Sequence, residues 1–149
     1  MLTSFITKQA DVQFTVSGEM IGKSVVCNPI QIVQSLTNLV NNAVDAVSGH
    51  SGAWVRLNLE YGKGTTRFRI IDSGLGIAFA EQKNLFEAFF TTKRKGTGLG
   101  LSVTRRIAEA HEGSVRYELH NGNTSFVLEL PNVGPNTQTF KTIPFDVAV

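Results

Sequence analysis

Residues 38–46 read Asn-Leu-Val-Asn-Asn-Ala-Val-Asp-Ala, and two glycine-rich turns follow, Asp72-Ser73-Gly74-Leu75-Gly76 and Gly96-Thr97-Gly98-Leu99-Gly100-Leu101. Each segment alone is weak evidence, because short motifs often match by chance. Together they describe an asparagine-rich helix, an Asp-Gly turn and a second glycine loop that opens another helix. In this order they predict a pocket for a nucleotide and its metal ion.

The chain has 149 residues, the usual size of one domain with a proper hydrophobic core. Its 14 basic and 12 acidic residues give a net charge of +2. The sequence has no basic run with interleaved aromatic side chains, so it gives no indication of a nucleic-acid partner. The sequence contains neither an apolar run of about 20 residues nor a signal peptide. We therefore expect a cytoplasmic chain without direct membrane contact, even if a parent protein is anchored in a membrane.

Hydrophobic periodicity predicts an alternation of strands and helices. Asn28-Pro29 is typical of a helix start, and Asn121-Gly122 is typical of a hairpin turn. We expect one domain over residues 1–131 and an extended or partly disordered tail over residues 132–149. The predicted strands are 11–16, 24–27, 54–60, 66–71, 115–120 and 124–130, and the predicted helices are 29–48, 78–86 and 99–112.

The asparagine-rich segment belongs to a predicted amphipathic helix. Asn38 and Asn42 are one turn apart, so their amide oxygens can converge on one hard cation such as Mg²⁺. A solvated helix face is the alternative interpretation of two asparagines alone. The predicted apolar face is Val33, Leu36, Val40, Ala43 and Val47, and the predicted polar face is Gln31, Ser35, Asn38, Asn42 and Asp45.

The Asp-Gly turn follows a predicted strand. Gly74 and Gly76 allow a sharp turn and the close approach of a flat ligand. The Asp72 carboxylate can accept a hydrogen bond from an exocyclic amine such as that of adenine. The alternative is an ordinary turn in which Asp72 caps local amides. The apolar side chains that would line a ring here are Ile71, Leu75 and Ile77.

The second glycine loop precedes a predicted helix. Gly96, Gly98 and Gly100 allow backbone N–H groups to point at phosphate oxygens, and the positive helix end adds to this attraction. The basic residues 93–95 could neutralise further phosphate charge. The spacing matches neither a Walker loop nor a dinucleotide fingerprint. A flexible surface loop with solvated basic residues is the alternative.

Taken together, the motifs closely resemble the ATP-binding catalytic domain of two-component sensor histidine kinases, within the GHKL superfamily. Four motifs in the family's order make this resemblance highly specific, and it covers roughly residues 12–131. The segment before the glycine loop has the Thr-Thr-Lys form seen in part of the family. The N, G1, F and G2 boxes correspond to Asn38–Ala46, Asp72–Ile77, Leu85–Lys93 and Gly96–Ser102.

The resemblance implies an α/β, Bergerat-type two-layer sandwich, a mixed sheet covered on one face by three helices. It implies an ATP-dependent protein-histidine kinase that uses Mg²⁺ and acts in a phosphorelay. Asn42 and Lys93 would be catalytic, and Asn42 with Asn38 would bind the metal. The implied nucleotide-binding residues are Asn38, Asn42, Asp45, Asp72, Gly74, Gly76, Ile77, Phe86, Thr92, Lys93, Gly96, Thr97, Gly98, Leu99, Gly100, Leu101 and Thr124.

Two departures from a whole kinase matter. His50, His111 and His120 do not stand in a His-Glu/Asp-x-x-x-Pro setting, and we expect the last two at the surface. The partners would then be a histidine-bearing dimerisation domain absent from this chain and a response regulator. Related ATPases carry a glutamate general base where this chain has Asn38, and an amide cannot accept the proton. The resemblance thus implies transfer to a protein nucleophile with little hydrolysis.

Two alternatives belong to other functional classes. A stand-alone serine kinase of the anti-sigma-factor type shares this fold, but the Phe-rich F box and the Thr-Thr-Lys sequence argue against it. A degenerate module could serve only as a docking surface, yet Asp72, Asn42 and the loop glycines are all present. Mg-ATP binding separates a degenerate module from a kinase. Transfer to a histidine or to a serine separates the two kinases.

Overall fold

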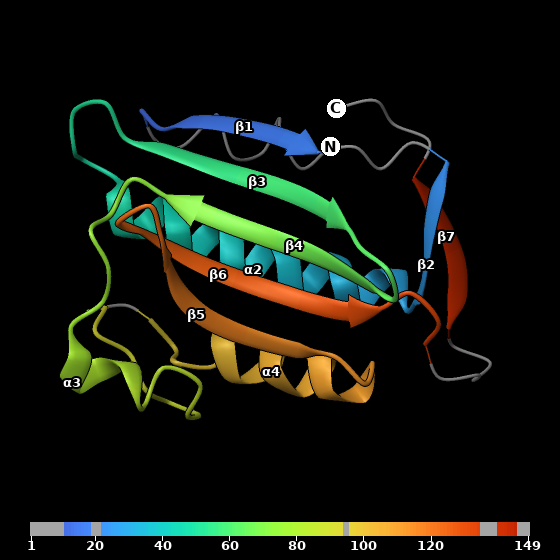
Figure 1. The fold of residues 1–149 in the computed structure, drawn as a ribbon. Helices are drawn as coiled ribbons and strands as arrows, with labels where there is room; N and C mark the ends of the chain where they lie inside the picture. Colours follow the sequence, from blue (N-terminus) through green and yellow to red (C-terminus); the bar gives the residue numbers. More distant parts are fainter. Residues whose placement is uncertain (1–10, 19–21, 94–95, 135–139, 146–149) are drawn as a thin grey trace.

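The computed structural model describes residues 11–18, 22–93, 96–134 and 140–145. A five-stranded mixed sheet with the order β1-β3-β4-β6-β5 forms its centre (Figure 1). β1 pairs with β3 in parallel, and the remaining neighbours are antiparallel. The strands are β1 (Gln13–Gly18), β3 (Trp54–Tyr61), β4 (Thr65–Asp72), β5 (Ser114–His120) and β6 (Asn123–Pro131).

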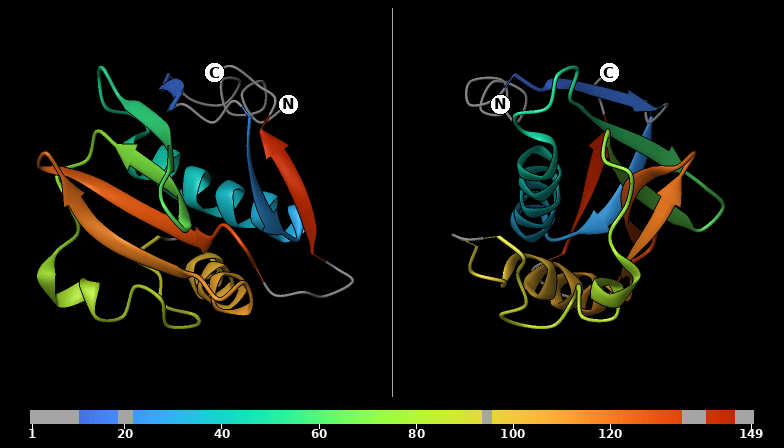
Figure 2. Two further views of the ribbon diagram at one scale, coloured as in Figure 1. Left: turned by 45° about the vertical axis from the view of Figure 1, so that its right-hand side comes forward. Right: turned by 90° about the vertical axis from the view of Figure 1, so that its left-hand side faces the viewer.

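Two long helices, α2 (Pro29–Val47) and α4 (Gly100–Ala110), cover one face of this sheet (Figure 2). The third described helix, α3 (Phe79–Gln82), is a single turn in the segment after β4 and occupies only the first part of the predicted helix 78–86. The predicted α/β class, a mixed sheet with helices on one face, is confirmed.

The start of α2 confirms the Asn28-Pro29 prediction. The Asn28 side chain accepts hydrogen bonds from the backbone N–H groups of Ile30 and Gln31 at 3.1 and 3.3 Å. Pro29 occupies the first helical position, where its missing N–H costs nothing. The helix therefore begins where local sequence alone places it.

The buried face of α2 is turned by about one residue from the predicted one. Val33 is 49% exposed, whereas Ser35 is fully buried, so both assignments were wrong. Ile32 and Leu39 face the core instead, and the 3.6-residue period places Ser35 between them on that face. The Ser35 hydroxyl has no hydrogen-bond partner among the described residues.

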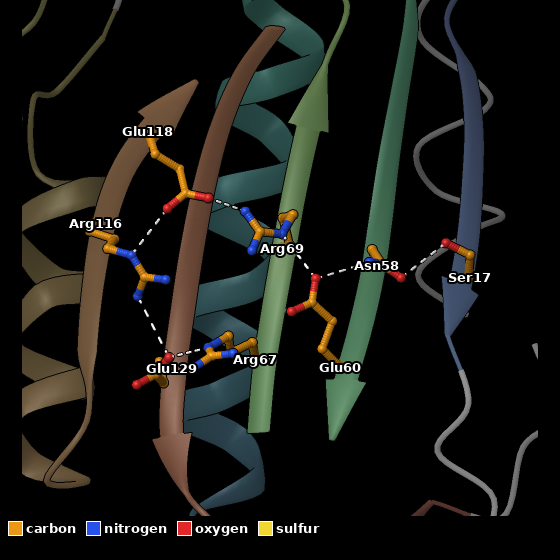
Figure 3. A network of polar contacts seen from close by, with 8 residues as sticks. All are labelled: Ser17, Asn58, Glu60, Arg67, Arg69, Arg116, Glu118 and Glu129. Carbon is orange, nitrogen blue, oxygen red and sulfur yellow. Dashed lines mark hydrogen bonds and ion pairs between the residues drawn. The ribbon is translucent and has the colours of Figure 1, made fainter. Parts of the chain in front are cut away.

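The sheet has one dry and one wet face, as the alternation in β4 predicts. Phe68 and Ile70 are buried against the helices, while Arg67 and Arg69 point to the outer face. Figure 3 shows a polar network across that outer face. It consists of Ser17, Asn58, Glu60, Arg67, Arg69, Arg116, Glu118 and Glu129.

Arg69 stands at the centre of this network, with a side chain only 11% exposed between Glu60 and Glu118. Burial opposes ionisation of Glu118, but its bonds to Arg69 and then Arg116 outweigh burial and lower the pKa of the Glu118 carboxyl. Every arginine of the network has an acidic partner, so the charges within this network are balanced.

His111, at the end of α4, was expected at the surface, and that expectation was wrong. Its side chain is 1% exposed. Nδ1 lies 2.7 Å from the Ile107 carbonyl oxygen, and Nε2 accepts a bond from the Asn28 N–H at 3.0 Å. The ring also lies against Phe140, with centroids 4.4 Å apart. The imidazole therefore links the end of α4 to the start of α2.

Helical periodicity predicts an apolar stripe of Leu99, Val103, Ile107 and Ala110 on α4, and this prediction is partly wrong. Ile107 is buried, but Leu99 is 37% exposed and Ala110 is exposed. Ser102 and Thr104 take buried positions, and their hydroxyls donate to the carbonyl oxygens of Leu99 and Gly100. Local bonds to the backbone satisfy these hydroxyls, so small polar residues can face the core.

A second, two-stranded sheet joins β2 (Lys23–Cys27) to β7 (Lys141–Phe145) in antiparallel register. Periodicity did not predict a strand at β7; the division of the chain at residue 131 stays a prediction. Burial raises the pKa of the Cys27 thiol, as expected for a small core residue. Among the described residues, no helix has both the length and the apolar character needed to cross a bilayer.

Candidate functional site

A pocket of about 890 Å³ opens between the second half of α2, the turn after β4, the glycine loop and the start of α4. We use glycine loop for residues 89–93 and 96–99, the described part of that connection. A cavity of this size is within the range of small-molecule sites. All three segments singled out in the sequence contribute to its wall.

Asp72 ends β4 at the inner wall of the pocket and is 2% exposed. Its Oδ1 accepts a bond from the Gly74 N–H at 2.7 Å. Burial raises the pKa of the Asp72 carboxyl, while the bonds from Gly74 and the Thr124 hydroxyl act in the opposite direction. A buried carboxylate held by donors on its protein side retains lone pairs for an amine of the ligand.

Gly74 is required for this close arrangement. A Cβ at this position would lie 2.6 Å from Asp72 Oδ1 and 3.1 Å from Thr124 Oγ1. Contacts this short force a rearrangement of the carboxylate. The glycine therefore allows the turn to fold over Asp72 and leaves its carboxylate at the pocket.

The beginning of β6 fixes the turn from behind. The Thr124 hydroxyl accepts the Gly76 N–H at 3.0 Å, and the Thr124 N–H donates to the Gly74 carbonyl at 3.0 Å. Asn123 donates to the same carbonyl at 3.2 Å. A rigid strand thus positions the turn, as precise binding sites require.

The α2 wall of the pocket carries two oxygens that meet one cation. The Lys93 ammonium lies 2.9 Å from Asn42 Oδ1 and 2.8 Å from Asp45 Oδ2. Asn38 behaves differently, because its amide nitrogen donates to the Gly100 carbonyl at 3.3 Å. Asn38 therefore connects α2 to the start of α4, and its role as a second metal ligand stays a prediction.

The start of α4 supplies hydrogen-bond donors to one end of the pocket. Gly100 and Leu101 line the cavity, and no side chain caps this helix end. The first N–H groups of a helix have no partner within the helix. They are therefore available to an anion, and the helix dipole favours one at this end.

Gly98 sets the path of the glycine loop. Its φ is +68°, and a Cβ there would lie 2.4 Å from the carbonyl carbon of Phe89. The Phe89 N–H also donates to the Gly98 carbonyl at 2.9 Å. The two ends of the loop thus lie in direct backbone contact.

We expect Gly98→Ala to destabilise the glycine loop by at least about 1–2 kcal/mol, the usual cost of a left-handed conformation for an L side chain. Hydrogen exchange of the loop amides would measure this change. Gly49→Ala is the matched control, because Gly49 has a φ of +84° but no atom within 4 Å of a built Cβ. Equal loop exchange in both variants would contradict the role of the Phe89 contact.

Most of the predicted binding residues line this one pocket. Two do not: Phe86 and Leu99 lie outside its wall. Phe86 packs edge-on against Phe126 at 6.3 Å, so it supports the wall from behind. Those that line it are Asn38, Asn42, Asp45, Asp72, Gly74, Gly76, Ile77, Thr92, Lys93, Gly96, Thr97, Gly98, Gly100, Leu101 and Thr124.

Sequence reasoning missed several lining residues because their contribution depends on tertiary structure. His50, Ser51 and Gly52 follow α2 and have no motif of their own. Phe90 and Leu85 belong to the Phe-rich segment, where the sequence does not say which aromatic ring points inward. Of the apolar side chains predicted to line a ring, Leu75 and Ile77 line the pocket, whereas Ile71 does not. The remaining missed residues are Asn41, Ala46, Val47, Ser73, Ala78, Glu81, Thr91 and Phe126.

The donor set fits a magnesium ion that arrives with a nucleotide. Among the described residues, no group of three or more His, Cys, Asp or Glu side chains could hold a metal by itself. The Lys93 ammonium nevertheless shows that Asn42 Oδ1 faces a cation at this wall of the pocket. Mg²⁺ commonly takes one or two protein oxygens and completes its shell with phosphates and water.

Comparison with known proteins agrees with this geometry. Residues 27–134 match the family described as "Histidine kinase-, DNA gyrase B-, and HSP90-like ATPase". The chain belongs to this family. Within the family, it is 38% identical over 107 residues to the signal transduction histidine-protein kinase AtoS of Escherichia coli, covering 71% of this chain and 17% of AtoS.

A second relative is the sensor histidine kinase ZraS of Escherichia coli, which is 34% identical over 126 residues, 84% of this chain and 26% of ZraS. The chain thus spans about a quarter or less of these two proteins. The nucleotide-free catalytic domain of histidine kinase ThkA superposes with a TM-score of 0.79 and 29% identity, over 89% of this chain and 86% of that one. This ATPase domain is therefore similar to the catalytic domains of histidine kinases.

Proposed function

We propose that this ATPase domain binds Mg-ATP and transfers the γ-phosphoryl group to a histidine on a separate dimerisation domain. The observation that carries the proposal is the convergence of Asp72, the Asn42–Lys93 pair and the open end of α4 on one pocket. These are an amine acceptor, a cationic phosphate site and an anion-binding helix end. Together they match the parts of a nucleoside triphosphate.

The proposed roles follow the three parts of the ligand. Asp72 accepts a hydrogen bond from the adenine amine. That end of the pocket is shaped by Gly74, Gly76, Ile77 and Thr124. Asn42, assisted by Asn38, would hold Mg²⁺, which neutralises phosphate charge when bound. Asp45 contacts the site through Lys93. The phosphates would be held by Thr92, Lys93, Gly96, Thr97, Gly98, Gly100 and Leu101, with Phe86 and Leu99 supporting the loop.

The proposed reaction forms a bond between an imidazole nitrogen and the γ-phosphorus while the bond from that phosphorus to the bridging oxygen of ADP breaks. The imidazole proton passes to an acidic neighbour on the partner or to water. This domain orients the triphosphate and neutralises its charge, the largest contributions in phosphoryl transfer. Asn38 cannot act as a general base toward water, which favours the protein nucleophile.

The proposed partners are a histidine-bearing dimerisation domain and, after it, a response regulator. ThkA has been solved in complex with the response regulator TrrA, and that ThkA chain superposes on this one with a TM-score of 0.73 and 26% identity. We propose a cytoplasmic location for the domain, because a phosphorelay of this kind draws on cytoplasmic ATP. The relatives named above are histidine kinases, so they give no support to the serine-kinase alternative.

Phosphotransfer from γ-labelled ATP tests the proposal. The chain would be mixed with a histidine-bearing helical hairpin, with the same hairpin carrying alanine in place of that histidine, and with a serine-bearing partner. We expect acid-labile, alkali-stable label on the histidine hairpin alone. Acid-stable label on serine, or release of free phosphate without labelled protein, would contradict it.

A further inference from the structure

The Lys93 side chain occupies the place where the metal is proposed to bind. Its ammonium lies 2.9 Å from Asn42 Oδ1, the oxygen assigned to Mg²⁺, and 2.8 Å from Asp45 Oδ2. Two cations held at one oxygen would repel each other strongly. Lys93 therefore has to leave Asn42 before a metal can use the same oxygen.

We propose that Asp45 is a positioning residue that holds Lys93 on Asn42 in the nucleotide-free domain and releases it when Mg-ATP binds. This inference rests on the proposed function of the pocket and adds a nucleotide-dependent exchange of partners. Before binding, Lys93 pairs with Asp45 and Asn42. After binding, Lys93 pairs with the triphosphate, and Asn42 Oδ1 becomes free for the metal.

The exposure of the pair makes such an exchange feasible. The side chains of Lys93 and Asp45 are 37% and 59% exposed, respectively. Ion pairs this open to solvent contribute little stability, so they separate at small cost. A triphosphate carries several negative charges against the single charge of Asp45, and it therefore competes effectively for the ammonium.

The same contact determines how the glycine loop is held. The other hydrogen bonds given for its described residues stay within the loop or reach Glu87 just before it and the start of α4 just after it. Among the described residues, the two side-chain bonds of Lys93 are the hydrogen bonds that join this loop to α2. Loss of Asp45 should therefore loosen the loop in the free domain.

The sign of the effect on affinity distinguishes this role from direct nucleotide binding. Once Lys93 has moved to the phosphates, the Asp45 carboxylate stays near negative charge without its partner. The charge of Asp45 then opposes Mg-ATP binding, and removal of that charge should make binding tighter. If Asp45 instead contacted the nucleotide or a metal-bound water, its removal would weaken binding.

The test is Asp45→Asn, which keeps the size of the side chain and removes its charge. We expect the Kd for Mg-ATP, measured by titration calorimetry, to fall roughly two- to fivefold, the range of an exposed ion pair. Without nucleotide, we expect the amides of residues 90–93 to exchange faster by a similar factor. Asp45→Glu keeps the charge and should not tighten binding.

Glu112→Gln is the matched control, because it removes one exposed acidic charge just beyond the far end of α4. Lys93→Gln should loosen the free loop as Asp45→Asn does, and the double variant should add nothing further. Three results would each overturn the inference. They are faster amide exchange in the double variant than in either single variant, unchanged amide exchange in Asp45→Asn, and weaker Mg-ATP binding by Asp45→Asn. The exchange measurement needs no ligand, so it tests the Lys93 contact even if the wild-type chain fails to bind Mg-ATP.

Discussion

Replacement of Asp72 by asparagine should weaken Mg-ATP binding by about 1–3 kcal/mol, roughly a 5- to 150-fold rise in Kd. The Asp72 carboxylate is 2% exposed and is held by the Gly74 N–H at 2.7 Å. An amide of the same shape turns one acceptor into a donor, which would face the adenine amine. Titration calorimetry of the variant beside the wild-type chain measures the change.

The stability of the same variant separates a binding effect from misfolding. Burial raises the pKa of Asp72, so the folded state holds this proton more tightly than the unfolded chain does. The stability that protonated Asp72 contributes is therefore fully present below its pKa in the unfolded chain, and it is lost as the pH rises through its pKa in the folded state. Asp72→Asn carries no charge at neutral pH, so the free variant should be at least as stable there as the wild-type chain.

Thermal unfolding of the nucleotide-free proteins, from acidic pH below the unfolded pKa of Asp72 up to neutral pH, would check the stability. Asp11→Asn is the matched control, because Asp11 is exposed at the start of the described chain. We expect normal Mg-ATP binding in the control, and weak binding with intact stability in Asp72→Asn. Unchanged affinity in Asp72→Asn would remove Asp72 from the binding site.

Asn42→Asp should lower phosphotransfer to a supplied histidine domain by about 100-fold or more, the scale for loss of a group that stabilises transition-state charge. The new carboxylate would stand beside Asp45 and 2.9 Å from the present position of the Lys93 ammonium. It would hold Lys93 on α2 and away from the phosphates. The measurement is the rate of label transfer at saturating Mg-ATP.

Asn121→Asp provides the matched control for this substitution. Asn121 lies in the turn between β5 and β6 with a φ of +52°, a conformation that aspartate also tolerates. The control makes the same chemical change at an exposed turn, so transfer should stay at the wild-type rate. Normal transfer by Asn42→Asp would show that the metal assignment is wrong.

Local signals in the sequence account for much of the fold. The Asn28 cap, the alternation of Phe68 and Ile70 with two arginines, and the Asn121-Gly122 turn all act over a few residues. Such features depend on backbone geometry and on one buried face. These elements can therefore be predicted from the sequence without knowing what packs against them.

The burial predictions that were wrong concern residues whose partners lie far away in the sequence. His111 is buried because Asn28 and Phe140, far away in the chain, supply its partners. Ser35 is buried because the sheet selects the face of α2, and two neighbouring apolar residues, Ile32 and Val33, leave that choice ambiguous. No local pattern contains this information.

The candidate site shows the same division. Order and spacing of the motifs predict that Asp72, Asn42 and the loop glycines belong to one pocket, and the structure brings them together. The ion pair between Lys93 and Asp45 could not be predicted, because the two residues are 48 positions apart. Neither could the contact of Asn38 with Gly100, which depends on how α2 crosses the start of α4.

Titration calorimetry of the wild-type chain with Mg-ATP determines whether this pocket is a working nucleotide site. We expect saturable one-site binding in the micromolar range, competition by ADP, and weaker binding when EDTA removes the metal. The absence of any binding heat or competition across millimolar nucleotide, from a chain that unfolds cooperatively, would contradict it.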